Sequence, residues 1–234
     1  MTGRVFLAGG GGAEDSVGID RAFAARVAGS AVLYVPLAKD LSARDYEAGR
    51  DWLRSALEPL GIARIGMWSA GPAPDLAALR GYGGVYLSGG DTARLLTVLR
   101  TTGALDVLRA YVAAGGALYG GSAGAAVLGR DIGTTAHLDR GVASASDTRG
   151  SDLLGGWSVW PHYRPEEADA AAAWARDHDG GVIALGERGG LVIGPDGVRS
   201  SGADAAWLVE SGRPPRRLAA GERLSAPLAP ALTL

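Results

Sequence analysis

Short apolar runs alternate with amphipathic stretches through the first half of this chain, and this alternation restricts the fold most strongly. The stretch 44–60 carries Tyr46, Trp52, Leu53 and Leu57 at helical spacing, with charged residues between them. Strands that alternate with helices pack as a parallel sheet covered on both faces, so we predict an α/β fold with a doubly wound, mostly parallel sheet flanked by helices. The expected strands are 5–8, 31–36, 63–68, 84–88 and 116–119, and the expected helices are 44–60, 76–79, 93–100 and 104–114.

The pattern changes after Gly129, where short strands are separated by turns. No linker interrupts the chain, and 234 residues with 47% hydrophobic content fit a single catalytic α/β domain spanning residues 1–234. In this half we expect strands at 138–146, 157–160, 181–185, 190–193 and 206–209, an Ala-rich helix at 166–176, a hairpin turn at 194–197, and an irregular tail from Pro214 onward.

Composition excludes several classes of function. The net charge is −2 and no basic patch stands out, which argues against nucleic acid as a partner. No apolar run is long enough for a membrane helix, and the N-terminal apolar stretch is too short for a signal peptide. Without cysteine there is no disulfide, thiol nucleophile or thiolate metal site, and no His, Asp or Glu cluster has metal-ligand spacing. We therefore expect a cytoplasmic protein without a metal or cofactor. The sequence does not decide whether the protein forms a homodimer.

A glycine-flanked serine follows one of the expected strands, in the stretch 118–126 (LYGGSAGAA). A serine at a tight turn between a buried strand and a helix is the geometry of a nucleophile elbow. Gly120, Gly121 and Gly124 leave room for that turn, and the helix start would place backbone N–H groups beside the Ser122 hydroxyl. The motif also arises by chance in a chain with 38 glycines, and similar turns bind phosphate, so other residues must decide.

A serine nucleophile needs a base, and histidine is the usual one near neutral pH. The chain has three histidines. His178 lies in a polar setting after an expected helix, which indicates the surface, and His137 lies among Thr and Ala residues and stays an alternative. His162 follows the apolar run 157–160 and Pro161, which places it at a strand end, where a parallel sheet presents catalytic groups. His162 is therefore the preferred base.

The third member of such a triad is a carboxylate that orients the imidazole. Glu187 follows the strand expected at 181–185 and is flanked by glycines, so it is the preferred acid. A turn glutamate that pairs with Arg188 is the alternative interpretation, and Asp131 and Asp139 compete for the role. In an ordinary α/β-hydrolase the acid lies between the serine and the histidine. The candidates for that order are Asp131, Asp139, Asp147 and Asp152.

The oxyanion of an acyl-transfer reaction needs two backbone donors. Gly89 and Gly90 follow the buried strand expected at 84–88 and can turn an N–H toward Ser122 without a side chain in the way. The N–H of Ala123 would be the other donor.

Four segments in this order resemble the dipeptidase E and cyanophycinase family of serine peptidases. They are Ser88-Gly-Gly-Asp-Thr92, Gly120-Gly-Ser-Ala-Gly-Ala125, Pro161-His-Tyr163 and Val182-Ile-Ala-Leu-Gly-Glu187. The resemblance runs from about Val5 to Val209. It implies a fold like that of class I glutamine amidotransferases, with a serine in place of their cysteine, and hydrolysis of a peptide bond through an acyl-enzyme. Ser122 matches the nucleophile and His162 the base. Glu187 matches the acid in one view of the family. In another view the acid is an Asp shortly after the serine, which here would be Asp131 or Asp139.

The segment after His162 departs from the family pattern. Members that cleave Asp-X dipeptides carry an Arg-bearing segment there, whereas this segment is acidic and alanine-rich, and neither Arg164 nor Arg176 matches clearly. Cyanophycinases place Asp-Gln before the histidine, where this chain has Trp160-Pro161. The Asp-X specificity is therefore not carried over.

Three functions remain after these observations. The preferred one is a serine dipeptidase or exopeptidase that acts on small peptides. A non-peptidase acyl hydrolase or esterase would use the same residues, and a non-enzymatic module could hold an anion with glycines 9–12 and Gly89-Gly90. Whether the peptidase attacks at the amino or the carboxy end stays open.

Overall fold

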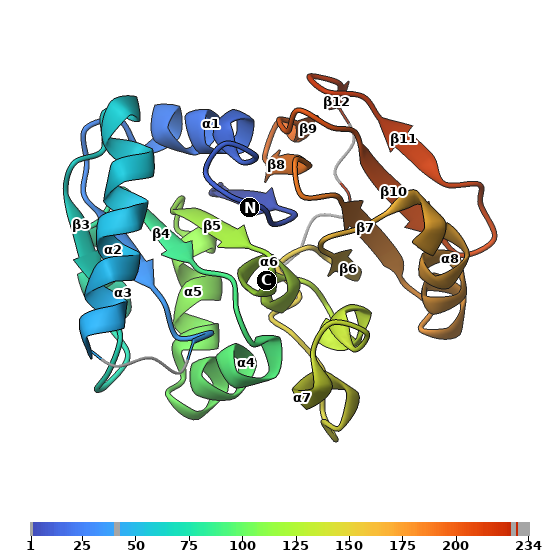
Figure 1. The fold of residues 1–234 in the computed structure, drawn as a ribbon, viewed down its shortest axis with the longest axis horizontal. Helices are drawn as coiled ribbons and strands as arrows, with labels where there is room; N and C mark the ends of the chain where they lie inside the picture. Colours follow the sequence, from blue (N-terminus) through green and yellow to red (C-terminus); the bar gives the residue numbers. More distant parts are fainter. Residues whose placement is uncertain (1, 40–42, 226–227, 229–234) are drawn as a thin grey trace.

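The main sheet has eight strands. The computed structural model describes residues 2–39, 43–225 and 228. The strands of this sheet are β1 (Arg4–Ala8), β2 (Val32–Val35), β3 (Ile65–Met67), β4 (Gly84–Leu87), β5 (Ala117–Gly121), β8 (Gly190–Gly194), β9 (Gly197–Ser200) and β12 (Arg223–Leu224). Their order is β12-β9-β8-β1-β5-β4-β2-β3 (Figure 1). The five neighbouring strands β1, β5, β4, β2 and β3 are parallel to one another. On the other side of β1, each of β8, β9 and β12 is antiparallel to the strand before it in the sheet. The predicted mostly parallel α/β fold is confirmed.

A second, four-stranded sheet lies beside the first. It consists of β6 (Trp157–Trp160), β7 (Gly181–Leu185), β10 (Ala206–Glu210) and β11 (Arg216–Leu218), in the order β11-β10-β7-β6. β6 and β7 are parallel, so their carboxyl ends meet at the same edge. The sequence predicted three of these four strands but not that they form a separate sheet. The division of the chain into one domain stays a prediction.

The helices cover both faces of the main sheet. Short 3₁₀ turns occupy Glu58–Leu60, Ile132–Thr135 and Pro165–Glu167. The α-helices are α1 (Val17–Val27), α2 (Ala43–Leu57), α3 (Leu76–Arg80), α4 (Thr92–Thr101), α5 (Ala104–Ala113), α6 (Ala123–Leu128), α7 (Arg140–Ala143) and α8 (Ala168–Asp177). In the part of the chain that the structure describes, no helix is long and apolar enough to cross a membrane.

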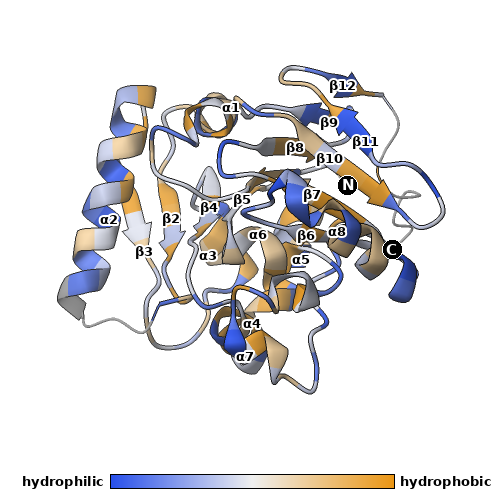
Figure 2. Cartoon of the chain, turned by 45° about the vertical axis from the view of Figure 1, so that its right-hand side comes forward, coloured by the Kyte–Doolittle hydropathy of each residue, from blue (hydrophilic) through white to orange (hydrophobic). Residues whose placement is uncertain are grey.

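Alternating side chains of each strand enter two different cores. On one face Phe6, Tyr34, Tyr86 and Tyr119 pack against α1 and α2, and on the other Leu87 and its counterparts on the neighbouring strands pack against α3 to α6. This is the two-residue period of a strand buried on both sides. Figure 2 shows the resulting distribution of hydropathy: strands β2 and β10 are largely hydrophobic, and helix α2 carries hydrophilic bands. A third cluster packs α8 on the outer face of the second sheet.

The expected strand at 138–146 is wrong. Asp139 caps α7 instead, because its carboxylate accepts the N–H of Gly141 at 2.8 Å and so starts a helical turn in a segment of small residues. The tail is also less irregular than expected, since β11 and β12 lie within it, and its last part, residues 226–227 and 229–234, falls outside the described residues.

Candidate active site

Ser122 occupies a strained turn between β5 and α6. Its backbone has φ 51° and ψ −111°, a region that a residue with a side chain rarely adopts. The turn is held by the Ser122 N–H, which donates to Ala8 O at 3.0 Å. It also depends on glycines, because a Cβ at Gly120 would lie 2.5 Å from Gly124 O, and one at Gly124 would lie 2.4 Å from Leu87 O. The sequence motif therefore folds as an elbow that lifts the hydroxyl above the end of the sheet.

His162 lies against Ser122. Its Nε2 is 2.7 Å from Ser122 Oγ, although the two residues come from different sheets. Its backbone also has positive φ, at 53°, and its N–H donates to Gly9 O at 2.9 Å. Gly10 lies directly against the ring, since a Cβ there would be 2.2 Å from Cε1 of His162. Because β1 is adjacent to β5, the carboxyl end of β1 brings His162 and Ser122 together.

Sequence reasoning missed this role of Gly9 and Gly10. The signal was present, because a run of glycines directly after the first strand indicates a close backbone approach. What the sequence did not reveal is that β6 ends over β1. The expectation that His162 follows a strand of the parallel sheet is corrected: β6 belongs to the second sheet, where it pairs parallel with β7.

Glu187 lies on the other side of the imidazole. Its Oε1 is 3.4 Å from His162 Nδ1, and β6 and β7 place the two residues together because they are parallel neighbours. The glutamate side chain is 59% exposed and the contact is longer than an ordinary hydrogen bond. Arg188 forms no ion pair with it among the described residues.

The other two histidines lie away from Ser122. His137 stacks on Trp160 with ring centroids 4.8 Å apart, and its Nε2 is 3.2 Å from Glu167 Oε1. His178 stacks on Trp174, and its Nδ1 is 2.9 Å from the Trp174 carbonyl oxygen. Neither ring contacts the elbow.

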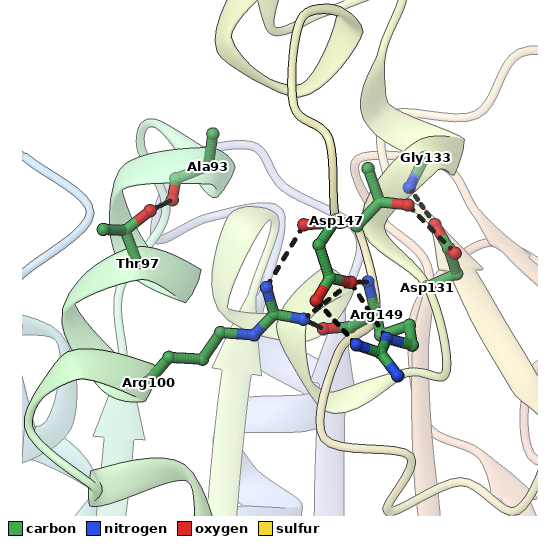
Figure 3. Close-up of polar contacts among 8 residues, drawn as sticks. Ala93, Thr97, Arg100, Asp131, Gly133, Asp147 and Arg149 are labelled. Atoms are coloured by element: carbon green, nitrogen blue, oxygen red, sulfur yellow. Dashed lines mark hydrogen bonds and ion pairs between the residues drawn. The ribbon is translucent and has the colours of Figure 1, made fainter.

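The competing aspartates are engaged elsewhere. Figure 3 shows Asp131 bound to the Gly133 N–H, at 2.7 Å, and Asp147 held between Arg149 and Arg100. Hydrogen bonds from Arg149, together with the nearby Arg100, hold the pKa of Asp147 well below its usual range. The fourth candidate for the hydrolase order, Asp152, accepts the Gly156 N–H at 2.6 Å.

Asp139 lies nearer the site but serves the backbone. Besides capping α7, its Oδ2 accepts the N–H groups of Thr92 at 2.6 Å and Ala93 at 3.3 Å, at the start of α4. It therefore ties the first turns of two helices together beside the elbow. No contact joins Asp139 to His162 among the described residues.

The expected oxyanion donors surround the elbow. A Cβ at Gly89 would lie 3.2 Å from Ser122 Cβ, so the end of β4 passes directly beside the serine. Gly90 has φ 145° and no room for a side chain, because a Cβ would lie 2.5 Å from Ala38 O. Ala123 is the first residue of α6, where the helix leaves its N–H groups without partners inside the helix.

Two cavities meet at the Ser122–His162 pair. One, of about 560 Å³, is lined by Glu187, Arg164 and Leu138 as well as by the pair itself. The other, of about 530 Å³, lies on the α1 and α2 side and includes Trp52. Leu138 and Trp52 are two of the three large apolar side chains that are exposed among the described residues. Arg176 lines neither cavity and pairs with Asp177 on α8.

The arrangement of a strained serine, a histidine in hydrogen-bond contact and a glutamate behind it is that of a serine hydrolase. A family model, peptidase family S51, matches residues 5–200. The chain belongs to peptidase family S51. It is therefore a serine peptidase, a hydrolase, as the sequence predicted.

Solved structures share the fold of this S51 peptidase. A structure described as a candidate peptidase E protein from Listeria monocytogenes EGD-e has 22% identity and a TM-score of 0.66, covering 86% of this chain and 99% of its own. A peptidase from an acI-B1 Actinobacterium has 23% identity and a TM-score of 0.74, with 97% and 98% covered. No curated protein matches the sequence. Among the residues that the structure describes, no group of three or more His, Asp or Glu side chains is placed to hold a metal ion.

Proposed function

We propose that this S51 peptidase hydrolyses small peptides, as a dipeptidase or exopeptidase, through an acyl-enzyme on Ser122. The observation that carries the proposal is the 2.7 Å contact between Ser122 Oγ and His162 Nε2 at a backbone turn strained in the manner of a nucleophile elbow. His162 takes the hydroxyl proton as Oγ attacks the peptide carbonyl, and then gives it to the leaving amine.

Glu187 is the proposed orienting acid. It is the carboxylate in contact with Nδ1, whereas Asp131 and Asp139 accept backbone N–H groups elsewhere. The contact of 3.4 Å is long, and catalytic hydrogen bonds in unliganded enzymes often shorten only when substrate binds. A negative charge there holds the imidazole in the tautomer that accepts the serine proton and stabilises the imidazolium that forms.

The backbone N–H groups of Gly89, Gly90 and Ala123 are the proposed oxyanion donors. The Ser122 N–H is excluded from this role because it already donates to Ala8 O. Fixed backbone donors beside the developing oxyanion supply a large part of the rate enhancement in acyl transfer.

The size of the two cavities supports small peptides as substrates. Volumes of about 560 and 530 Å³ lie in the range of small-molecule sites, and each begins at the serine. A short peptide placed with its scissile bond at Ser122 would extend into both. The cytoplasm stays the predicted location.

A panel of dipeptides, tripeptides and matched esters tests the proposal. We expect amide hydrolysis by the wild type that Ser122→Ala lowers by about 10³-fold or more, because only binding and oxyanion effects remain. Hydrolysis of esters without any peptide cleavage would instead support the acyl hydrolase.

A further inference from the structure

The cavity between the main sheet and helices α1 and α2, which we call the α1–α2 cavity, has features that peptide hydrolysis at Ser122 does not require. It reaches Ser122 and His162 at one end and runs along the aromatic face of the sheet. The hydroxyl groups that line it belong to Ser16, Tyr34, Tyr86, Ser88, Tyr119 and Ser122.

Three tyrosines of its floor, Tyr34, Tyr86 and Tyr119, belong to a row of aromatic residues in register across four neighbouring strands. Phe6 pairs with Tyr119, Tyr119 with Tyr86, and Tyr86 with Tyr34. The three tyrosines are at most 7% exposed. Phe6 is a ring without a hydroxyl that is 1% exposed in the same row, so burial in this row does not require a hydroxyl. A buried hydroxyl lowers stability unless it is hydrogen-bonded, so the tyrosine hydroxyls need polar partners.

One end of the row is a buried acid. Asp20, on α1, is 5% exposed, and its two oxygens accept the hydroxyls of Tyr119 and Ser16, each at 2.7 Å. No described Lys, Arg or His forms an ion pair with it. A hydroxyl has a single hydrogen, and that of Tyr119 is directed to the carboxylate. Ser16 Oγ has its shortest contact with the carboxylate and longer ones with Gly12 O at 3.3 Å and Ala13 O at 3.5 Å, all of them acceptors inside the protein. With their hydrogens engaged in this way, Tyr119 and Ser16 have lone pairs but no hydrogen to offer a ligand in the cavity that they line.

The Ser88 hydroxyl in the cavity lacks a hydrogen bond of normal geometry. Ser88 is 5% exposed, and its Oγ lies close enough to the Tyr34 hydroxyl to offset part of the rise that burial causes in the pKa of Tyr34. Ser88 and Ser122 follow the adjacent strands β4 and β5, so the orphan hydroxyl lies on the same side of the sheet edge as the nucleophile. A bound polar group would satisfy it.

We propose that the α1–α2 cavity binds a positively charged nitrogen of the peptide substrate, next to the bond that Ser122 attacks. The acceptor-only hydroxyls of Tyr119 and Ser16 match a group that has only hydrogens to donate, and Asp20 behind them supplies the opposite charge. The nitrogen is either the α-ammonium of an N-terminal residue or the cationic tip of a basic side chain. This inference rests on the proposed peptidase function and adds the substrate class.

The charges around the cavity are consistent with this polarity. Asp45 and Lys39 both line its outer part, and their charges offset each other, while His162 lies at the catalytic end. Burial raises the pKa of Asp20, and the hydrogen bonds from Ser16 and Tyr119 offset part of that rise. Tyr86 is a further titratable group close enough for the charge of Asp20 to act on it. Binding of a cation favours the ionised acid, so the KM of a cationic peptide should increase as the pH falls through the raised pKa of Asp20.

Binding can be measured without catalysis in Ser122→Ala, by NMR titration with small probes. Alaninamide against N-acetylalaninamide tests the α-ammonium, and Nα-acetyl-lysinamide against Nα-acetylnorleucinamide tests a basic side chain. We expect at least one cationic probe to bind about tenfold or more tightly than its neutral partner, as hydrogen bonds to a charged group imply. The pair that shows the difference identifies the source of the nitrogen. Equal binding within both pairs would overturn the proposal.

Asp20→Asn in the same background keeps the shape and should reduce the preference to within about twofold. Asp106→Asn, an exposed acid on α5, makes the same charge change on the opposite face and should keep the preference. Tyr119→Phe, which removes one acceptor, replaces Asp20→Asn if that variant does not fold. A preference that survives in Asp20→Asn, or in Tyr119→Phe where it takes that place, contradicts the proposal.

Turnover by the wild-type enzyme separates this inference from the function on which it rests. Probe preference without hydrolysis of any peptide would sink the peptidase proposal and leave the cation site standing. Peptide hydrolysis with equal kcat/KM and equal binding for charged and neutral partners would contradict the cation site and leave the peptidase proposal standing.

Discussion

Gly10→Ala tests the position of His162, the proposed base, without changing any group that is proposed to react. A Cβ at position 10 would lie 2.2 Å from Cε1 and 2.5 Å from Nδ1 of His162. The ring must move by about 1 Å or more to regain ordinary contact, and a misplacement of that size costs about 10²-fold in rate. The backbone at Gly10 has φ 147°, so the alanine adds strain of about 1–3 kcal/mol.

The assay is the rate at which a fluorophosphonate labels Ser122, because it needs the activated serine but no knowledge of the substrate. Gly29→Ala is the matched control: its φ of 71° is also strained for alanine, but nothing lies within 4 Å of the added Cβ. We expect both variants to lose stability in urea and only Gly10→Ala to lose labelling, by about 10²-fold. A folded Gly10→Ala that is labelled at the wild-type rate would refute the placement of His162.

Three further predictions concern carboxylates. Glu187→Gln should lower the labelling rate by roughly 10²-fold or more, because the neutral side chain no longer stabilises the imidazolium, and an unchanged rate would remove it from the triad. Asp139→Ala should instead lower the free energy of unfolding by about 0.5–2 kcal/mol through the lost helix cap, with the labelling of the folded fraction retained; a loss of labelling at unchanged stability would return Asp139 to the triad. Burial raises the pKa of Asp20, so the folded state binds more protons than the unfolded state between the unfolded and the folded pKa, and wild-type stability should fall as the pH rises through that window. Asp20→Asn should therefore flatten the pH dependence in urea and be more stable than the wild type at neutral pH; lower stability at neutral pH would contradict this.

The elements that the sequence predicted well are those with a strong local signal. The parallel strands β1, β2, β4 and β5 are apolar runs that end at a glycine, a proline or a polar residue, and helix α2 has a clear apolar face. Helix α1 was missed because Asp20, one of its buried residues, is an acid that interrupts the apolar pattern. That acid is stabilised by Tyr119, 99 residues away in the chain, a contact that no local pattern reveals.

The same limit applies to the site. Ser122 and His162 were found because each follows an apolar strand with turn residues, and the structure brings them together. Which sheet a strand joins is decided by pairing at long range, so the sequence did not reveal that β6 ends over Gly9 and Gly10. Asp139 looked like a loop residue in a strand-like segment, whereas its two oxygens hold backbone N–H groups of two helices.

Mapping the fluorophosphonate adduct tests the central claim most directly. Trypsin cleaves after Arg109 and Arg130, so Ser122 lies in the peptide 110–130, which mass spectrometry can sequence. We predict a single adduct on Ser122, absent from Ser122→Ala and formed about 10²-fold or more slowly in His162→Ala, because the hydroxyl then lacks its base. An adduct on another residue, or peptide hydrolysis by an enzyme whose Ser122 stays unlabelled, would contradict the account.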